Sequence, residues 1–158
     1  MNITPYMHYD GIPTFRDSFI ESLYDKMVRD GTDKTVFYGG DVLSRRDFLN
    51  KMKSVGTVLI VAVEDNTSLA CGWINGFECN IARVHFCLFS EVWGERSIEI
   101  GKEMIEKALS LTGCDMLTGM IPEKNKRAID FSIKCGAKLM GILPYGSTGP
   151  TAFLYYVR

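Results

Sequence analysis

One stretch constrains the fold of this chain more than any other: residues 84–113, where an apolar run passes through a short loop into a helical pattern. Residues 84–89 are almost all apolar, which is typical of a buried strand. The polar segment 90–97 follows and contains Gly94, and small and apolar residues then recur at helical spacing over 97–112. A strand, a glycine-containing loop and a helix in this order often hold a phosphate, because the free N–H groups and the positive dipole end of the helix face the ligand.

Length and charge exclude several classes of protein. The 158 residues fit one domain, residues 1–158, with a sizeable core. The net charge of −1 predicts no global attraction to nucleic acid or to an acidic membrane surface. No apolar run reaches the roughly 20 residues that span a bilayer, and no signal peptide is visible. The five cysteines are odd in number and form no CxxC pair, so we expect no zinc or other metal site, and a cytoplasmic location.

The N-terminal third of the chain predicts two helices after an irregular start. Residues 2–13 are rich in tyrosine and glycine and are expected to be loose. Thr14 is the expected cap of a first helix, which ends at Asp30 and Gly31. Ser44 is the expected cap of a second, shorter helix.

From residue 57 onward the pattern changes to strands. The continuous apolar run 58–63 predicts a strand that is covered on both faces. Short links to the next two strands, 69–77 and 81–89, predict a three-stranded antiparallel meander. The remaining expected elements are a helix over 97–112, a strand over 117–121, a helix over 125–134 and strands over 138–143 and 151–157. This order predicts an α/β (α+β) fold with a mixed sheet.

Several residues near the C-terminus match a known family motif, N-x-x-A-x-x-(L/F)-Y-x-K-x-G-F. The matching residues are Asn125, Ala128, Phe131, Lys134 and Gly136, while Ser132 and Ala137 stand where tyrosine and phenylalanine are usual. In this motif and in the order of its elements, the chain resembles the GNAT superfamily of acetyl-CoA-dependent N-acetyltransferases. The resemblance implies a mixed, mainly antiparallel sheet of about six to seven strands flanked by about four helices.

The family's coenzyme loop, usually written Q/R-x-x-G-x-G/A, fits this chain less closely. A start at Arg96 places Glu99 at the first glycine position, and a start at Trp93 places Arg96 there. Trp93 precedes Asn125 by 32 residues, which is the usual family spacing, so we take the Trp93 start. The resemblance then implies that acetyl-CoA binds Phe86, Cys87, Leu88, Trp93, Gly94, Glu95, Arg96, Ser97, Ile98 and Asn125.

Backbone groups are expected to make most of these contacts. In the family, the strand pairs with the pantetheine arm as if the arm were an added strand, so the side chains of Phe86, Cys87 and Leu88 matter little. The loop N–H groups would hold the pyrophosphate, and Gly94 lets the chain pass close to it. Arg96 replaces a glycine, and we expect its guanidinium to pair with a phosphate.

Two residues are candidates for proton transfer. His85 is the candidate general base, since its reference pKa near 6.5 suits that task, and the alternative is a strand residue with a satisfied hydrogen bond. Ser132 is expected on the helix surface, because a hydroxyl is a poorer acid than a phenol. Tyr145, in the loop 144–150, is the substitute candidate for the acid.

The resemblance implies transfer of an acetyl group from acetyl-CoA to an amine of a small molecule or a protein. No motif names the acceptor, which is expected to contact the N-terminal helices and the loops 38–43 and 144–150. The alternative is a GNAT-like domain that binds acyl-CoA or a protein partner without efficient catalysis. The oligomeric state is open, and a dimer is one option.

Overall fold

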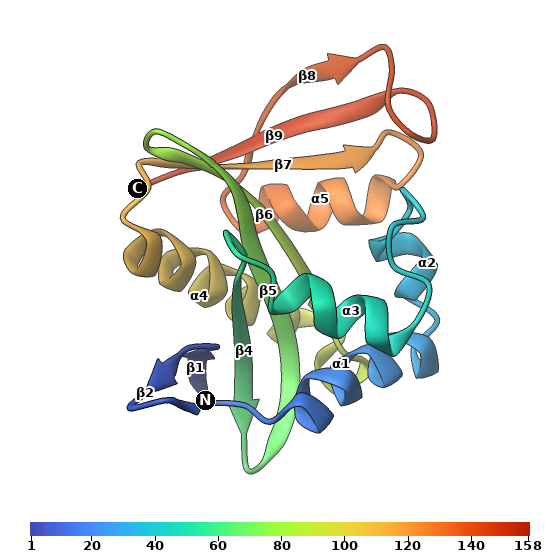
Figure 1. Ribbon diagram of the computed structural model, residues 1–158. Coiled ribbons are helices and arrows are strands. Elements are labelled where there is room, and N and C mark those ends of the chain that lie inside the picture. The colour runs from blue at the N-terminus through green and yellow to red at the C-terminus, as the bar shows by residue number, and fades with distance from the viewer.

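The computed structural model describes residues 1–158 (Figure 1). Its helices are α1 (Asp17–Arg29), α2 (Asp33–Val36), α3 (Arg45–Met52), α4 (Glu95–Thr112), α5 (Lys126–Lys134) and the short 3-10 helix η1 (Ser90–Val92). Its strands are β1 (Asn2–Pro5), β2 (His8–Tyr9), β3 (Ile12–Pro13), β4 (Val58–Glu64), β5 (Thr67–Glu78), β6 (Ile81–Leu88), β7 (Met116–Pro122), β8 (Lys138–Leu143) and β9 (Thr151–Val157).

Seven strands form one mixed sheet in the order β1-β4-β5-β6-β7-β9-β8. All neighbours run antiparallel except β6 and β7, which are parallel. The expected meander is β4, β5 and β6, and the predicted fold class is confirmed. The chain has one α-helix more than predicted, because the single turn α2 follows α1 after a break at Gly31, whose φ is 69°.

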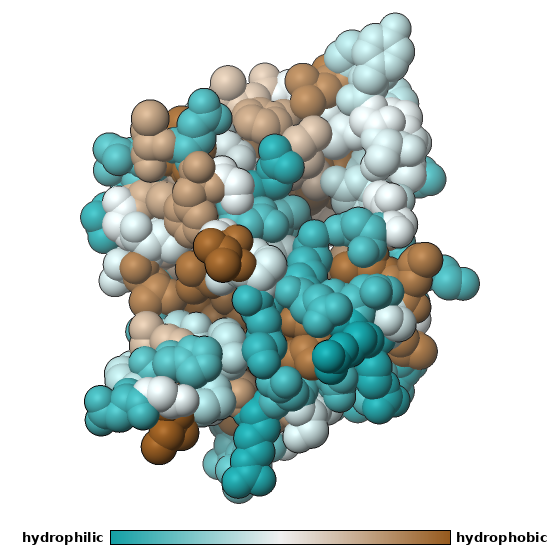
Figure 2. Space-filling view, in the orientation of Figure 1, coloured by the Kyte–Doolittle hydropathy of each residue, from teal (hydrophilic) through white to brown (hydrophobic).

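Helices cover both faces of the sheet, so the sheet lies between two hydrophobic cores (Figure 1). The core under α4 and α5 contains Ile100 and Leu117. The core under α1 and α3 contains Leu23 and Trp73. The strand β4, which lies between β1 and β5, contributes to both cores, which explains its continuous apolar run. On the solvent-facing side of α1 and α3, hydrophilic side chains gather on the surface (Figure 2). No helix combines the length and the apolar character needed to cross a bilayer.

The N-terminal segment corrects two predictions. Residues 2–5, which were expected to be loose, form β1 and pair antiparallel with β4, from Asn2 opposite Val63 onward. Thr14 does not cap α1, which begins after Arg16. Instead the Thr14 hydroxyl donates to the Pro5 carbonyl at 2.8 Å and accepts from the Met7 N–H at 3.1 Å. Because its hydroxyl makes these two bonds, the Thr14 side chain is not available for the helix cap that the sequence pattern predicted.

The other predicted helix ends are close to those in the structure. Ser44 caps α3 and Asn125 caps α5, each accepting a hydrogen bond from a backbone N–H of the first turn. Gly113 ends α4 in the left-handed conformation, as expected. The start of α4 lies two residues earlier than predicted, at Glu95, because Gly94 makes the turn at a φ of 113°.

Candidate active site

A cleft opens in the sheet where β6 and β7 separate. The two strands pair only over residues 81–83 and 116–118. Beyond this point, residues 84–88 and 119–122 line a cavity of about 530 Å³. The backbone groups of β6 that face β7 here have no strand partner, so they are available to an extended ligand that lies along the strand.

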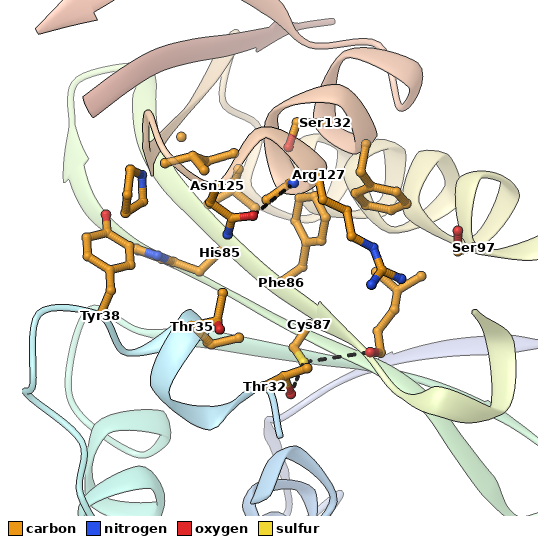
Figure 3. A pocket seen from close by; sticks show the side chains of 18 of the residues that line it. Thr32, Thr35, Tyr38, His85, Phe86, Cys87, Ser97, Asn125, Arg127 and Ser132 are labelled. Carbon is orange, nitrogen blue, oxygen red and sulfur yellow. Dashed lines mark hydrogen bonds between the residues drawn. The ribbon is translucent and has the colours of Figure 1, made fainter. Parts of the chain in front are cut away.

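The cleft passes through the sheet, because successive residues of β6 reach it from opposite faces. Phe86 packs with the core under α5, its ring centroid 5.7 Å from that of Phe131. His85 points to the opposite face and stacks on Trp73 at 5.1 Å between ring centroids. Below we call the half of the cleft with Phe86 the α5 side and the half with His85 the α1 side. Figure 3 shows side chains from both halves converging on one space.

The predicted coenzyme loop closes one end of the α5 side. Trp93 donates its indole N–H to the Leu88 carbonyl at 3.0 Å, which fixes the ring against the end of β6. Gly94 is the N-cap of α4, and the Ser97 hydroxyl donates back to its carbonyl at 2.5 Å. The first N–H groups of α4 have no intrahelical acceptor and lie next to the cleft, as the sequence pattern predicted for an anion site.

Two arginines near this end have different surroundings. Arg96 forms an ion pair with Glu64 on β4, which raises its pKa, and it does not line the cleft. Arg127, in the first turn of α5, lines the cleft and lies over the Trp93 ring at 5.5 Å from its centroid. No carboxylate lies within 4.0 Å of the Arg127 guanidinium, so its charge is free for a ligand. Arg127 is therefore the better-placed cation, and the sequence prediction missed it.

On the α5 side, Asn125, Ser132 and Tyr156 line the cleft. The Asn125 side-chain oxygen accepts from the Ala128 N–H at 3.2 Å, which leaves the amide N–H groups to donate elsewhere. Ser132 was expected on the helix surface, but it is buried, because this face of α5 packs toward β9. Its hydroxyl lies near the Tyr156 phenol. Burial raises the pKa of Tyr156 to about 12, against a smaller lowering by Ser132, so the phenol keeps its proton at neutral pH.

His85 is held as a neutral imidazole on the α1 side. Burial, and to a smaller extent the positive charges of Lys51 and Arg83, lower its pKa to about 4. Its Nε2 lies 3.3 Å from the Asn75 side-chain oxygen, so that nitrogen donates when it bears the proton. At neutral pH the His85 imidazole is therefore unprotonated and can act as a proton acceptor, but it is a weak base.

The two tyrosines of the predicted acceptor loops differ in position. Tyr38 lines the α1 side and donates its hydroxyl proton to the Met120 carbonyl on β7 at 3.0 Å. Tyr145, the substitute candidate for the acid, is 85% exposed and lies outside the cleft. The loop that carries it leaves the end of β8, at the edge of the sheet, and does not bring the phenol inward.

The structure brings most of the predicted site residues together. The predicted residues that line the cleft are His85, Phe86, Cys87, Leu88, Trp93, Gly94, Ser97 and Asn125. Glu95, Arg96 and Ile98 lie in the first turn of α4 but do not line it. The main residues that sequence reasoning missed are Thr32, Thr35, Arg127 and Tyr156, whereas Tyr38 belongs to the loop 38–43 that was expected to contact the acceptor. No group of three or more histidine, cysteine or acidic side chains comes together in a way that suits a metal ion.

No protein-family model matches this chain, and no curated protein does. Solved structures do match it. The aminoglycoside acetyltransferase AAC(6')-Ib, in complex with coenzyme A and kanamycin, aligns with a TM-score of 0.74 and 11% identity, over 99% of this chain and 95% of that chain. The spermidine N-acetyltransferase SpeG from Vibrio cholerae aligns with a TM-score of 0.73 and 9% identity, over 99% and 95% of the two chains.

A third structure gives the class its name. An acetyltransferase of the GNAT family from Bacillus anthracis aligns with a TM-score of 0.63 and 9% identity, over 87% of this chain and 90% of that chain. The chain thus has an acetyltransferase fold. That fold is the GNAT fold, as the sequence resemblance predicted. At these identities the likeness extends to the fold, and the chemistry has to be argued from the cleft.

Proposed function

We propose that this protein transfers an acetyl group from acetyl-CoA to an amine. The observation that supports this most strongly is the cleft through the sheet. Its α5 side offers an unpaired strand edge and a helix N-terminus, which suit the pantetheine arm and the pyrophosphate. Its α1 side opens on the other face, where a second molecule can reach the same strand. Direct transfer needs two substrates to meet in this way.

In this proposal acetyl-CoA lies on the α5 side along Phe86, Cys87 and Leu88. Its pyrophosphate lies at the loop of Trp93, Gly94, Glu95, Arg96, Ser97 and Ile98, which contributes mainly backbone N–H groups. Arg127 supplies the cation, and Asn125 donates an amide N–H to the arm of the coenzyme. The Leu88 carbonyl already accepts from Trp93, so the strand contacts come mainly from residues before it.

The transfer step begins on the α1 side. The amine nitrogen attacks the thioester carbonyl carbon, and β6 N–H groups stabilise the charge that develops on the carbonyl oxygen. The nitrogen becomes far more acidic as the N–C bond forms. A weak base such as neutral His85 then suffices to take the proton, directly or through one water. The C–S bond breaks, and its electron pair stays on the sulfur of coenzyme A.

Tyr156 replaces the missing tyrosine of the helix motif in this mechanism. Ser132 stands at the motif position, and both Ser132 and the phenol of Tyr156 from β9 line the cleft there. The pKa of about 12 makes full proton transfer to a thiolate unfavourable, since the thiol has a pKa near 8.5. Tyr156 therefore stabilises the departing thiolate by donating a hydrogen bond, and the sulfur leaves as an anion. Tyr145, exposed outside the cleft, has no part in this step.

The first test is binding of the coenzyme. Acetyl-CoA at millimolar concentration should raise the melting temperature, because a ligand that binds only the folded state stabilises it by mass action. Release of free thiol in the presence of an amine then tests the transfer. A thermal shift without thiol release for any amine would favour the alternative, a GNAT-like binding module. The absence of any shift or calorimetric heat would refute coenzyme binding.

A further inference from the structure

The α1 side of the cleft presents no free carboxylate to an acceptor. Its polar lining residues are Thr32, Thr35, Tyr38 and His85, which are all uncharged at neutral pH. The one carboxylate that lines the cleft is Asp30, and its side chain is only 3% exposed. Asp30 accepts hydrogen bonds from Arg29 and Ser90.

Two other acidic residues near this opening, Asp41 and Glu91, are paired with basic partners, while Asp33 on α2 has no ion pair but does not line the cleft. Asp41, whose charge raises the pKa of both His85 and Tyr38, forms an ion pair with Lys51 at 2.6 Å. Glu91 binds Arg29 and Lys26, and these partners lower its pKa to about 2. Asp30, Asp41 and Glu91 are therefore already paired and offer little charge to a polycationic amine.

Just before the point where the cleft begins, β6 carries an unpaired positive charge, Arg83, which does not itself line the cleft. Arg83 has no carboxylate within 4.0 Å, unlike Lys51. The Arg83 side chain is exposed. Its charge adds to burial and Lys51 in lowering the pKa of His85, and it opposes the rise that burial causes in the pKa of Tyr38. Arg83 and His85 are two residues apart on β6, so their side chains leave the same face of the strand about 7 Å apart. With Lys51 and Asp41 cancelling, the charge at the opening is that of Arg83.

We propose that the acceptor is an amine that also bears a carboxylate, bound with its nitrogen at His85 and its carboxylate at Arg83. An amino acid and the N-terminus of an acidic peptide both have this chemistry. The inference rests on the proposed acetyl transfer and names its acceptor class. Polycationic amines are named with the matched structures, kanamycin as a bound ligand and spermidine in the name of the enzyme. In this protein such amines would meet a like charge at the opening instead of a carboxylate.

Steady-state thiol release with a panel of amines tests the proposal. The panel contains free aspartate, the peptide Asp-Ala-Ala with a free N-terminus, phenethylamine, spermidine and kanamycin, at one ionic strength. We expect kcat/KM for one of the first two to exceed that for spermidine at least tenfold. Aspartate ahead of the peptide identifies a free amino acid as the source, and the reverse order identifies a peptide.

Variants of Arg83 then separate charge from fold. Arg83→Gln should raise KM for the carboxylate-bearing acceptor about tenfold and leave the thermal shift with acetyl-CoA unchanged, and Arg83→Glu should reverse the preference toward spermidine. Arg46→Gln is the matched control, because Arg46 is also exposed without a carboxylate partner but lies on α3. Three results would overturn the inference. The first is spermidine or kanamycin as the best acceptor, and the second is equal KM values in Arg83→Gln and Arg46→Gln. The third is that neither carboxylate-bearing amine reacts or binds to the CoA-saturated protein. If the unmodified protein does not bind acetyl-CoA at all, the proposed function itself is refuted.

Discussion

Replacing Arg127 by alanine should weaken coenzyme A binding by about 5- to 30-fold. A hydrogen bond between a guanidinium and a phosphate contributes roughly 1.5–3 kcal/mol. Arg127 gives up part of its contact with the Trp93 ring when it turns to the phosphate, and an exposed cation–π contact is worth roughly 0.5–1 kcal/mol. The difference of about 1–2 kcal/mol corresponds to the stated loss of affinity.

Arg96→Ala is the matched comparison. Arg96 is exposed and paired with Glu64, so its removal loses only a solvent-screened surface ion pair, which contributes little to stability, and no ligand contact. Titration calorimetry at low salt should therefore give the same Kd for coenzyme A in Arg96→Ala and in the unmodified protein. Pantetheine, which lacks the phosphates, should bind all three proteins alike, because Arg127 acts on the phosphates.

The opposite ranking would refute this reasoning. If Arg96→Ala weakens coenzyme A tenfold and Arg127→Ala leaves it unchanged, the Arg96 guanidinium leaves Glu64 when the ligand binds, and the sequence expectation for Arg96 is correct. If pantetheine and coenzyme A lose affinity equally in Arg127→Ala, the variant has disturbed the start of α5 rather than a phosphate contact.

Three further outcomes are expected. Tyr156→Phe should lower kcat at least tenfold with the Kd for acetyl-CoA unchanged, whereas Ser132→Ala should change turnover less than threefold; an unchanged kcat in Tyr156→Phe would remove the phenol from the mechanism. Gly101→Ala should cost about 1–3 kcal/mol in urea unfolding, because the new methyl group would lie 2.5 Å from the Cys135 sulfur, and Cys135→Ala should recover part of that loss in the double variant. The pKa of His85 is lowered to about 4, so the unfolded chain binds more protons between pH 4 and 6.5 and stability falls as the pH falls through that window; His85→Asn should remove this part of the pH dependence, and an unchanged profile would contradict it.

The sequence was sufficient wherever a long local pattern determines the structure. The run 58–63 and the pattern 97–112 were read correctly as β4 and α4, since each is long and buried in one consistent way. The strand β1 escaped prediction because residues 2–5 are too few to show a strand pattern: β-branched Ile3 and Thr4 stand between Asn2 and Pro5, which are rare in strands. It forms because β4 would otherwise be an edge, and pairing satisfies that edge.

The site was predictable only along one stretch of chain. The residues of β6 and its loop follow one another, so a single motif located most of them. Tyr156 and Ser132 come from different elements and meet only because β9 pairs with β7 beside α5. No spacing in the sequence reports that contact. Tyr145 was chosen instead because it precedes the last strand, but its loop leaves the sheet at an edge and keeps the phenol in solvent.

The least typical residue of the coenzyme loop, Arg96, also has a structural explanation. A glycine is needed where the backbone takes a positive φ, and in this loop that position is Gly94, at 113°. Arg96 lies in the first turn of α4, where the backbone is helical and any side chain fits. Its side chain leaves toward Glu64 on β4, so it blocks neither the cleft nor the free N–H groups. The departure from the family pattern at this position therefore leaves the proposed anion site intact, because that site would depend on the start of the helix and on Gly94 rather than on a second glycine.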